Sequence, residues 1–221
     1  MSRWEIRIAT LIGAIVVGIA PPTTAAAEQP GLAIATLETL PVKGRAPKTG
    51  YTRDQFGQAW ADVNRNGCDT RNDILKRDLT VVVYKGGTRN CVVLSGTLLD
   101  RYSGETINFV RGNVSSMEVQ IDHVVALSNA WQTGAFKLTA DQRKALANDP
   151  MNLFAVKGRL NSQKGDGDAA TWLPPLKSFR CAYVAQQIAV KAKYSLWVVP
   201  PEKAAMLSIL AKCPTQKLPV S

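Results

Sequence analysis

Hydrophobic residues recur at helical spacing in several parts of the chain. In residues 52–63, Phe56, Ala59, Trp60 and Val63 follow this spacing and predict an amphipathic helix. A short helix is predicted after the Asn66-Gly67 turn, with Asp69 and Thr70 among its first residues. Thr139 and Gln142 are spaced as a capping box, which predicts a helix ending near residue 147. The remaining predicted helices cover residues 124–131, 158–164, 178–194 and 201–213.

Runs of β-branched residues predict the strands. Residues 79–84 and 90–100 are two such runs, and Gly86-Gly87 between them predicts a β-hairpin. Further strands are predicted at residues 105–110, 117–121 and 152–156. The expected fold class is therefore α+β, with a small antiparallel sheet and a helical C-terminal half in one domain.

The first 27 residues have the pattern of an export signal. Arg3 and Arg7 precede an apolar run over residues 8–20, and two prolines and three alanines follow it. The apolar run is short for a membrane span, and the small residues are typical of a signal-peptide cleavage site. We expect cleavage after residue 27 and no membrane attachment afterwards. An uncleaved N-terminal anchor is the alternative.

Residues 28–50 are rich in Pro, Gly and Thr and show no sustained period. They are predicted to form a linker or extended arm. Residues 51–221 are long enough to form one domain with a hydrophobic core. The sequence indicates no oligomeric state.

Four cysteines lie in the part expected to be exported: Cys68, Cys91, Cys181 and Cys213. An even number outside the cytoplasm favours two disulfides, for which three connectivities exist. We expect the most local one, Cys68–Cys91 with Cys181–Cys213. A zinc site is the competing interpretation, but no two cysteines form a C-x-x-C pair.

The net charge is +10, and it is +9 without residues 1–27, which contain Arg3, Arg7 and Glu5. A basic excess of this size suits a polyanionic partner such as nucleic acid or an anionic cell surface. A solvated basic surface without such a partner is the alternative.

The single histidine, His123, directly follows Asp122 at the end of a predicted strand. An imidazole accepts a proton near neutral pH, and so His123 is the candidate general base. Asp122 and Asn161 offer hard oxygen atoms, which suit Mg²⁺ or Mn²⁺ better than zinc. Adjacent strand residues point to opposite faces, so Asp122 and His123 share a site only where the strand bends. The change of period after His123 agrees with such a bend.

The order Asp122-His123, Asn152, Asn161 resembles an exported bacterial family of HNH endonucleases, whose domain was once catalogued as of unknown function. The similarity includes the strings YTRDQFGQAW, NGCDTRNDIL, NDPMNL, LNSQKGD and TWLPP. It implies a ββα-metal fold in which His123 is the general base and Asp122 and Asn161 bind one metal ion. Asn152 would hold the hairpin loop and position the histidine, and Lys164 would contact the scissile phosphate.

The motif departs from the letters H-N-H, because Asp122 stands at the first position and Asn161 at the last. We interpret this as a change of metal ligands that favours magnesium over zinc.

Other polar residues have weaker interpretations. Basic residues flank the second half of the motif and predict a phosphate-binding rim, for which a solvated face is the alternative: Lys157, Arg159, Lys177 and Arg180. Asp69 and Arg71 are expected to have a structural role, as an ion pair, rather than to shape the cleft.

The sequence therefore predicts a secreted, metal-dependent endonuclease that acts on DNA, with RNA as a second substrate left open. Neither a G-x-S-x-G elbow nor an H-E-x-x-H motif occurs, which argues against serine-esterase and zinc-protease chemistry. The non-enzyme alternative is a basic, disulfide-stabilised module that binds nucleic acid or cell-surface polyanions without cutting them.

Overall fold

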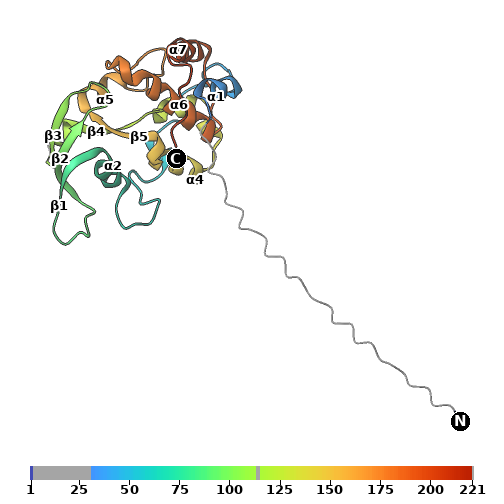
Figure 1. Ribbon diagram of the computed structural model, residues 1–221. Helices are drawn as coiled ribbons and strands as arrows, with labels where there is room; N and C mark the ends of the chain where they lie inside the picture. The colour runs from blue at the N-terminus through green and yellow to red at the C-terminus, as the bar shows by residue number, and fades with distance from the viewer. Residues whose placement is uncertain (2–30, 113–114, 221) are drawn as a thin grey trace.

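Two small antiparallel sheets and a set of helices form the described part of the chain (Figure 1). The computed structural model describes Met1, residues 31–112 and residues 115–220. The predicted signal peptide, apart from Met1, therefore lies outside the described residues. In chain order the main elements are α1 (Ala33–Thr39), α2 (Thr70–Asp78), β1 (Leu79–Tyr84), β2 (Val93–Leu99), β3 (Thr106–Val110), β4 (Val119–His123), α3 (Leu127–Gln132), α4 (Ala140–Asn148), β5 (Leu153–Lys157), α5 (Gly158–Lys164), α6 (Arg180–Lys193) and α7 (Pro200–Leu210).

The first sheet has the strand order β1-β2-β3, and both pairings are antiparallel. The predicted hairpin is thus confirmed. Helix α2 precedes it and begins where the Asp69 carboxylate accepts a hydrogen bond from the Asn72 N–H. Ile74 and Leu75 of α2 are buried in one apolar cluster with residues of both sheets, such as Phe109 and Leu153. This cluster connects the first sheet to the strands that carry the predicted site.

The second sheet consists of β4 and β5, and α5 follows β5 without a loop. The strands are antiparallel, and Asp122 pairs with Phe154 and His123 with Leu153. A side chain at Gly158, the first residue of α5, would place its Cβ only 1.8 Å from the Met117 carbonyl oxygen. Only glycine allows α5 to start this close to the segment before β4. The result is a strand–strand–helix unit with the predicted motif distributed over all three elements.

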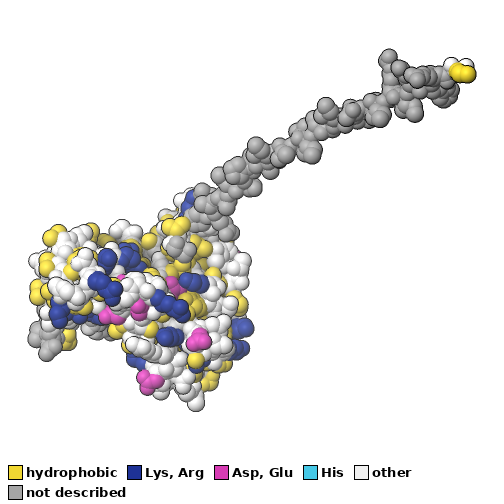
Figure 2. Space-filling view, turned by 90° about the horizontal axis from the view of Figure 1, so that it is seen from below, with side chains coloured by type: hydrophobic (Ala, Val, Ile, Leu, Met, Phe, Trp, Pro, Cys, Tyr) yellow, Lys and Arg dark blue, Asp and Glu magenta, His cyan; other side chains and the backbone are white. Residues whose placement is uncertain are grey.

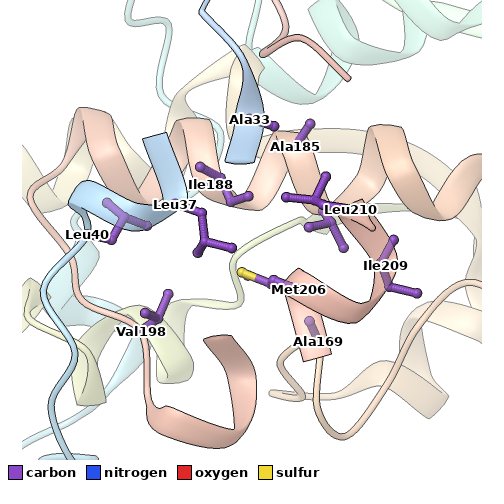
Figure 3. Close-up of a cluster of buried hydrophobic side chains, with 11 residues drawn as sticks. Ala33, Leu37, Leu40, Ala169, Ala185, Ile188, Val198, Met206, Ile209 and Leu210 are labelled. Atoms are coloured by element: carbon purple, nitrogen blue, oxygen red, sulfur yellow. The ribbon is translucent and has the colours of Figure 1, made fainter. Parts of the chain in front are cut away.

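Helices α1, α6 and α7 pack around a common apolar core, which also contains Ala169 and Val198 (Figure 3). The segment expected to be a linker, residues 28–50, therefore contains a helix that packs in the core. Its residues Ala33, Leu37 and Leu40 recur at helical spacing and are all buried. The stripe is short and lies among Pro and Gly residues, and for that reason it does not stand out in the sequence.

The two disulfides join the expected pairs. Cys68 is bonded to Cys91, which ties the segment before α2 to the segment before β2. Cys181 is bonded to Cys213, which links α6 to the residues just after α7. The predicted capping box of α4 is also present, formed by Thr139 and Gln142. None of the helices in the described ranges has the length and apolarity needed to span a bilayer.

The helix predicted over residues 52–63 was wrong. Only one 3-10 turn forms there, Arg53–Phe56, and Gly57 ends it with a φ of 71°. Trp60 also has a positive φ, of 57°, which no α-helix contains. Because the chain changes direction after Phe56, this side chain packs in an apolar cluster with Trp131, whereas Trp60 packs in the cluster that contains residues of β4. The helical spacing of these apolar residues thus reflects two separate packing sites.

Candidate active site

A cleft of about 490 Å³ is lined by Asp122, His123 and Asn161 together. Asp122 and His123 come from the last two positions of β4, and Asn161 comes from α5. The chain bends after His123, where the Val124 N–H donates to the Asn152 carbonyl oxygen at 2.8 Å. Three of the residues predicted from the sequence therefore meet in one cleft.

His123 has a defined tautomer because of its hydrogen bond to the chain. Its Nε2 lies 2.9 Å from the carbonyl oxygen of Ala147. A carbonyl oxygen only accepts, so Nε2 carries the proton and Nδ1 keeps a free electron pair. The pKa of His123 is lowered to about 4, mainly because burial disfavours the charged ring. The hydrogen bond to Ala147 raises this pKa, and the positive charges of Arg53 and Lys164 lower it. The ring is therefore neutral near pH 7 and can accept a proton at Nδ1.

The indole of Trp60 stacks on the His123 ring, with ring centroids 6.0 Å apart and an angle of 16° between the planes. Trp60 lines the cleft together with His123. The stack covers one face of the imidazole and restricts its rotation. Trp60 thus helps to orient the candidate base, a role that the sequence did not indicate.

The Asp122 carboxylate is held from two sides. Its Oδ1 accepts a hydrogen bond from the Lys164 ammonium at 2.8 Å, and its Oδ2 accepts one from the Tyr102 hydroxyl at 2.5 Å. Lys164 also donates to the His123 carbonyl oxygen at 2.7 Å. Each carboxylate oxygen retains electron-pair capacity for a further ligand.

Lys164 itself is buried and does not line the cleft. The structure thus places its ammonium beneath the cleft, where it holds Asp122 and the strand end. This differs from the predicted contact with the scissile phosphate, and the reason is that the Asp122 carboxylate and the His123 carbonyl already occupy the ammonium.

Asn161 presents an oxygen to the cleft. Its Nδ2 donates to Gln120 Oε1 at 2.9 Å, and its Oδ1 accepts no hydrogen bond from the described residues, so that Oδ1 is available to coordinate a cation. One carboxylate and one amide oxygen in a polar cleft suit a hard cation that keeps several water ligands, as Mg²⁺ does. No group of three or more His, Cys, Asp or Glu side chains within the described ranges converges on a metal position. The donor set therefore fits a magnesium-type site and does not fit a zinc site.

Asn152 is fully buried outside the cleft. Its Oδ1 accepts from the Val125 N–H at 2.8 Å, and its Nδ2 donates to the carbonyl oxygens of Val125 and Leu146, each at 3.3 Å. These bonds tie the turn after β4 to the end of α4, next to the carbonyl of Ala147 that holds His123. Asn152 thus lies where it can position the histidine through the backbone.

Two arginines also line the cleft: Arg53, which the sequence did not assign to the site, and Arg71, for which a structural role was expected rather than a part in shaping the cleft. Arg71 is half-buried and forms no salt bridge among the described residues, including the ion pair expected with Asp69. Burial lowers the pKa of its guanidinium and nearby Arg111 lowers it further, whereas the Asp69 carboxylate raises it. A partly desolvated cation that forms no salt bridge among the described residues is suited to bind an anion in the cleft. Arg71 reaches this place because α2 packs on β2 and β5, in the same apolar cluster as Ile121 of β4.

The basic residues of the predicted rim lie elsewhere. None of the four, Lys157, Arg159, Lys177 and Arg180, lines the cleft. Lys157 is paired with Glu105 at 2.5 Å, and the Arg180 guanidinium donates to the Pro174 carbonyl oxygen at 2.8 Å. Lys and Arg side chains are nevertheless spread over the surface with Asp and Glu among them, as Figure 2 shows for one face. The phosphate-binding rim stays a prediction, and the arginines that line the cleft itself are Arg53 and Arg71.

Comparisons with known proteins agree with a nuclease-like site. A family model described as GmrSD restriction endonucleases, C-terminal domain, matches residues 69–209. A protein of the fungus Arthroderma benhamiae, named "Uncharacterized secreted protein", is 40% identical over 179 residues, which is 80% of this chain and 82% of the relative. No solved structure matches the chain. The bacterial source implied by the sequence resemblance stays a prediction, since this relative is fungal.

Proposed function

Because the chain belongs to the family of GmrSD restriction endonuclease C-terminal domains, we propose that it is a secreted, divalent-metal-dependent endonuclease of the HNH type that hydrolyses phosphodiester bonds of DNA. The observation that carries the proposal is the meeting of Asp122, His123 and Asn161 in one cleft, with Nδ1 of His123 free to accept a proton. The β4–β5–α5 unit agrees with the strand–strand–helix order of the ββα-metal fold.

In this mechanism Nδ1 of His123 takes a proton from a water molecule, and the resulting nucleophile attacks the phosphorus in line. Arg71 and Arg53 contact the phosphate oxygens and stabilise the negative charge that develops there. The bond to the 3′ oxygen breaks, this oxygen takes a proton from water, and the products carry a 3′ hydroxyl and a 5′ phosphate.

Asp122 and Asn161 would hold one Mg²⁺ or Mn²⁺ ion. When bound there, the cation supplies charge neutralisation at the phosphate and at the departing 3′ oxygen. Lys164 and Tyr102 keep the Asp122 carboxylate in its orientation, since both of its oxygens accept hydrogen bonds from them. These two residues act as positioning residues and do not reach the substrate.

Secretion is supported by the name of the fungal relative and by the signal-peptide pattern of residues 1–27. The two disulfides agree with an oxidising environment. The alternative function is a basic module that binds polyanions without cutting them. Charge and export suit both functions, but a free Nδ1 of His123 in the same cleft as the oxygens of Asp122 and Asn161 favours the enzyme.

The test is cleavage of supercoiled plasmid by the purified protein with magnesium, with manganese and with excess chelator. We expect nicking that needs the metal and that falls about 10²- to 10⁴-fold in His123→Ala. Salt-sensitive retention of DNA should persist in this variant. Lys212→Ala, which removes an exposed charge outside the cleft, is the control and should cut at the wild-type rate.

Retention of plasmid without cutting under any metal would instead support the polyanion-binding module. Cleavage by His123→Ala at the wild-type rate would show that the site is elsewhere. A parallel assay with single-stranded RNA decides whether RNA is a second substrate.

A further inference from the structure

A further arginine, Arg111, lies close to Arg71 but outside the lining of the cleft. Its Nε donates to the carbonyl oxygen of Val93 in β2, and its Nη2 donates to Oδ1 of Asn72, each at 2.6 Å. Asn72 is buried and directly follows Arg71 in α2. These two hydrogen bonds therefore hold the Arg111 guanidinium between β2 and the first turn of α2, on the side where Arg71 enters the cleft.

Phe109 of β3 gives the same placement independently. The Arg71 guanidinium carbon lies 5.9 Å from the centroid of the Phe109 ring. The Arg111 N–H donates to the Leu94 carbonyl oxygen at 2.7 Å and so continues the pairing of β3 with β2. Residues two apart on an extended strand have their side chains on one face, as Phe109 and Arg111 do here. Both guanidiniums therefore lie over the same face of the first sheet.

The charges of these two arginines are not balanced by a bound carboxylate. The positive charge of Arg111 lowers the pKa of Arg71, which means that the two guanidiniums repel each other. Neither of them takes part in a salt bridge within the described part of the chain. The Asp69 carboxylate offsets part of the repulsion, but its two oxygens accept hydrogen bonds from the N–H and the Nδ2 of Asn72. An anion between the two guanidiniums would remove the rest of this repulsion.

Both guanidiniums also have donors left for such an anion. A guanidinium has five N–H groups in a planar fork. Arg111 uses Nε and Nη2 for the chain, and its Nη1 has no acceptor among the described residues. The Arg71 guanidinium donates no hydrogen bond to any described residue, and both side chains are only partly buried. Two such forks match the several oxygens of one phosphate group.

We propose that Arg71 and Arg111 together hold one phosphate of a nucleic-acid strand, next to the phosphate that is cut. The inference rests on the proposed nuclease function, because Arg71 lines the cleft in which the scissile phosphate would lie. Arg53 is the cleft arginine whose charge acts on His123, and it stays with the scissile phosphate. Arg71 then lies between the two phosphates, and Arg111 extends the binding surface beyond the cleft. The substrate is therefore a polynucleotide strand with consecutive phosphates, and Arg111 is a substrate-binding residue without a part in the chemical step.

The test is binding of a short fluorescent DNA duplex by the full chain in excess chelator, at a series of NaCl concentrations. Arg111→Gln keeps an N–H donor for Asn72 or Val93 but removes the charge. It should weaken binding about 10-fold near 0.1 M salt and lower the slope of log K against log salt by about one, because one phosphate contact is lost. Arg111→Lys keeps the charge without the fork, and so it should retain the slope but only part of the affinity. Lys212→Ala, which removes an exposed charge outside the cleft, should keep both close to the wild type.

The double variant Arg71→Gln with Arg111→Gln shows whether the two arginines hold the same phosphate. The double variant should lose at least about 3-fold less affinity than the product of the two single losses, since each contact strengthens the other. Additive losses would assign the arginines to separate sites and overturn the proposal. Wild-type affinity and slope in Arg111→Gln would overturn it as well. If this variant does not fold, Arg111→Lys decides, and wild-type affinity in Arg111→Lys counts against the proposal.

Binding in chelator needs no cleavage, and so this inference and the nuclease proposal fail separately. Metal-dependent cutting by the wild type, with an unchanged slope in Arg111→Gln, would remove the arginine pair and leave the nuclease function in place. A lower slope in Arg111→Gln, with no cutting under any metal, would keep the arginine pair as part of a polyanion-binding module.

Discussion

The ammonium of Lys164 and the carboxylate of Asp122 form a buried ion pair at 2.8 Å, with side chains 0% and 4% exposed. The same ammonium donates to the carbonyl oxygen of His123 at 2.7 Å. One lysine of α5 thus holds both members of the Asp-His motif at the end of β4. The pair connects the helix that carries Asn161 to the strand that carries the candidate base.

Lys164→Met is expected to destabilise the protein by about 3–5 kcal/mol, because it leaves the Asp122 charge buried without its cation. The loss of stability is measured as the difference in the free energy of unfolding between the variant and the wild type, obtained from urea titrations. Adding Asp122→Asn should recover part of the stability, since it removes the unpaired charge, but DNA cleavage should stay lost. Unchanged stability in Lys164→Met would contradict the ion pair.

Asn152→Ala should lower the free energy of unfolding by about 2–4 kcal/mol, because the Val125 N–H and two carbonyl oxygens lose a buried partner. The plasmid-cleavage rate should fall with it, since the turn that follows His123 loosens. Asn148→Ala is a comparison at a buried asparagine of α4, whose Oδ1 has no protein partner among the described residues. An equal loss of cleavage in both variants would argue against a positioning role of Asn152.

The stability of the metal-free protein should fall as the pH drops from about 6.5 to 4, partly because of His123. Its pKa is about 4 in the folded protein and about 6.5 in the unfolded chain, so only the unfolded chain takes up this proton within the window. His123 is the single histidine, and its contribution is on the order of 2–4 kcal/mol.

Urea titrations at pH 7 and pH 4, on the wild type and His123→Gln, isolate this contribution from that of the carboxylates. The wild type should lose more stability than the variant between the two pH values. Equal losses would mean that His123 is not buried as a neutral ring.

Arg71→Ala is expected to lower kcat/KM for DNA cleavage about 10- to 100-fold, the effect of losing a charged hydrogen bond to the phosphate. Arg159→Ala removes the same side chain outside the cleft and should change kcat/KM little at physiological salt. The two variants compare the cleft arginine with the predicted rim. A larger effect of Arg159→Ala would favour the rim.

The sequence predicted correctly those elements whose signal lies within a few neighbouring residues. The hairpin of β1 and β2, the capping box of α4 and helix α5 depend on turn residues and caps within a few positions of each other. The helix prediction for residues 52–63 failed because Phe56 and Trp60 pack in different apolar clusters, so that their spacing does not describe one helix face. Helix α1 was missed because its stability comes from packing on α6 and α7, which are distant in sequence.

The sequence by itself determined which reactive groups are present: one histidine after an aspartate, two asparagines in order, and four cysteines that follow a signal-peptide pattern. The sequence left three disulfide connectivities possible and favoured the most local one, and the structure shows that this one forms. Only the tertiary structure decided which groups act together, because side-chain contacts join residues that lie far apart along the chain. In the structure Lys164 forms a buried pair with Asp122, whereas the sequence had predicted a contact with the substrate. Arg71 and Trp60 line the cleft because of tertiary contacts.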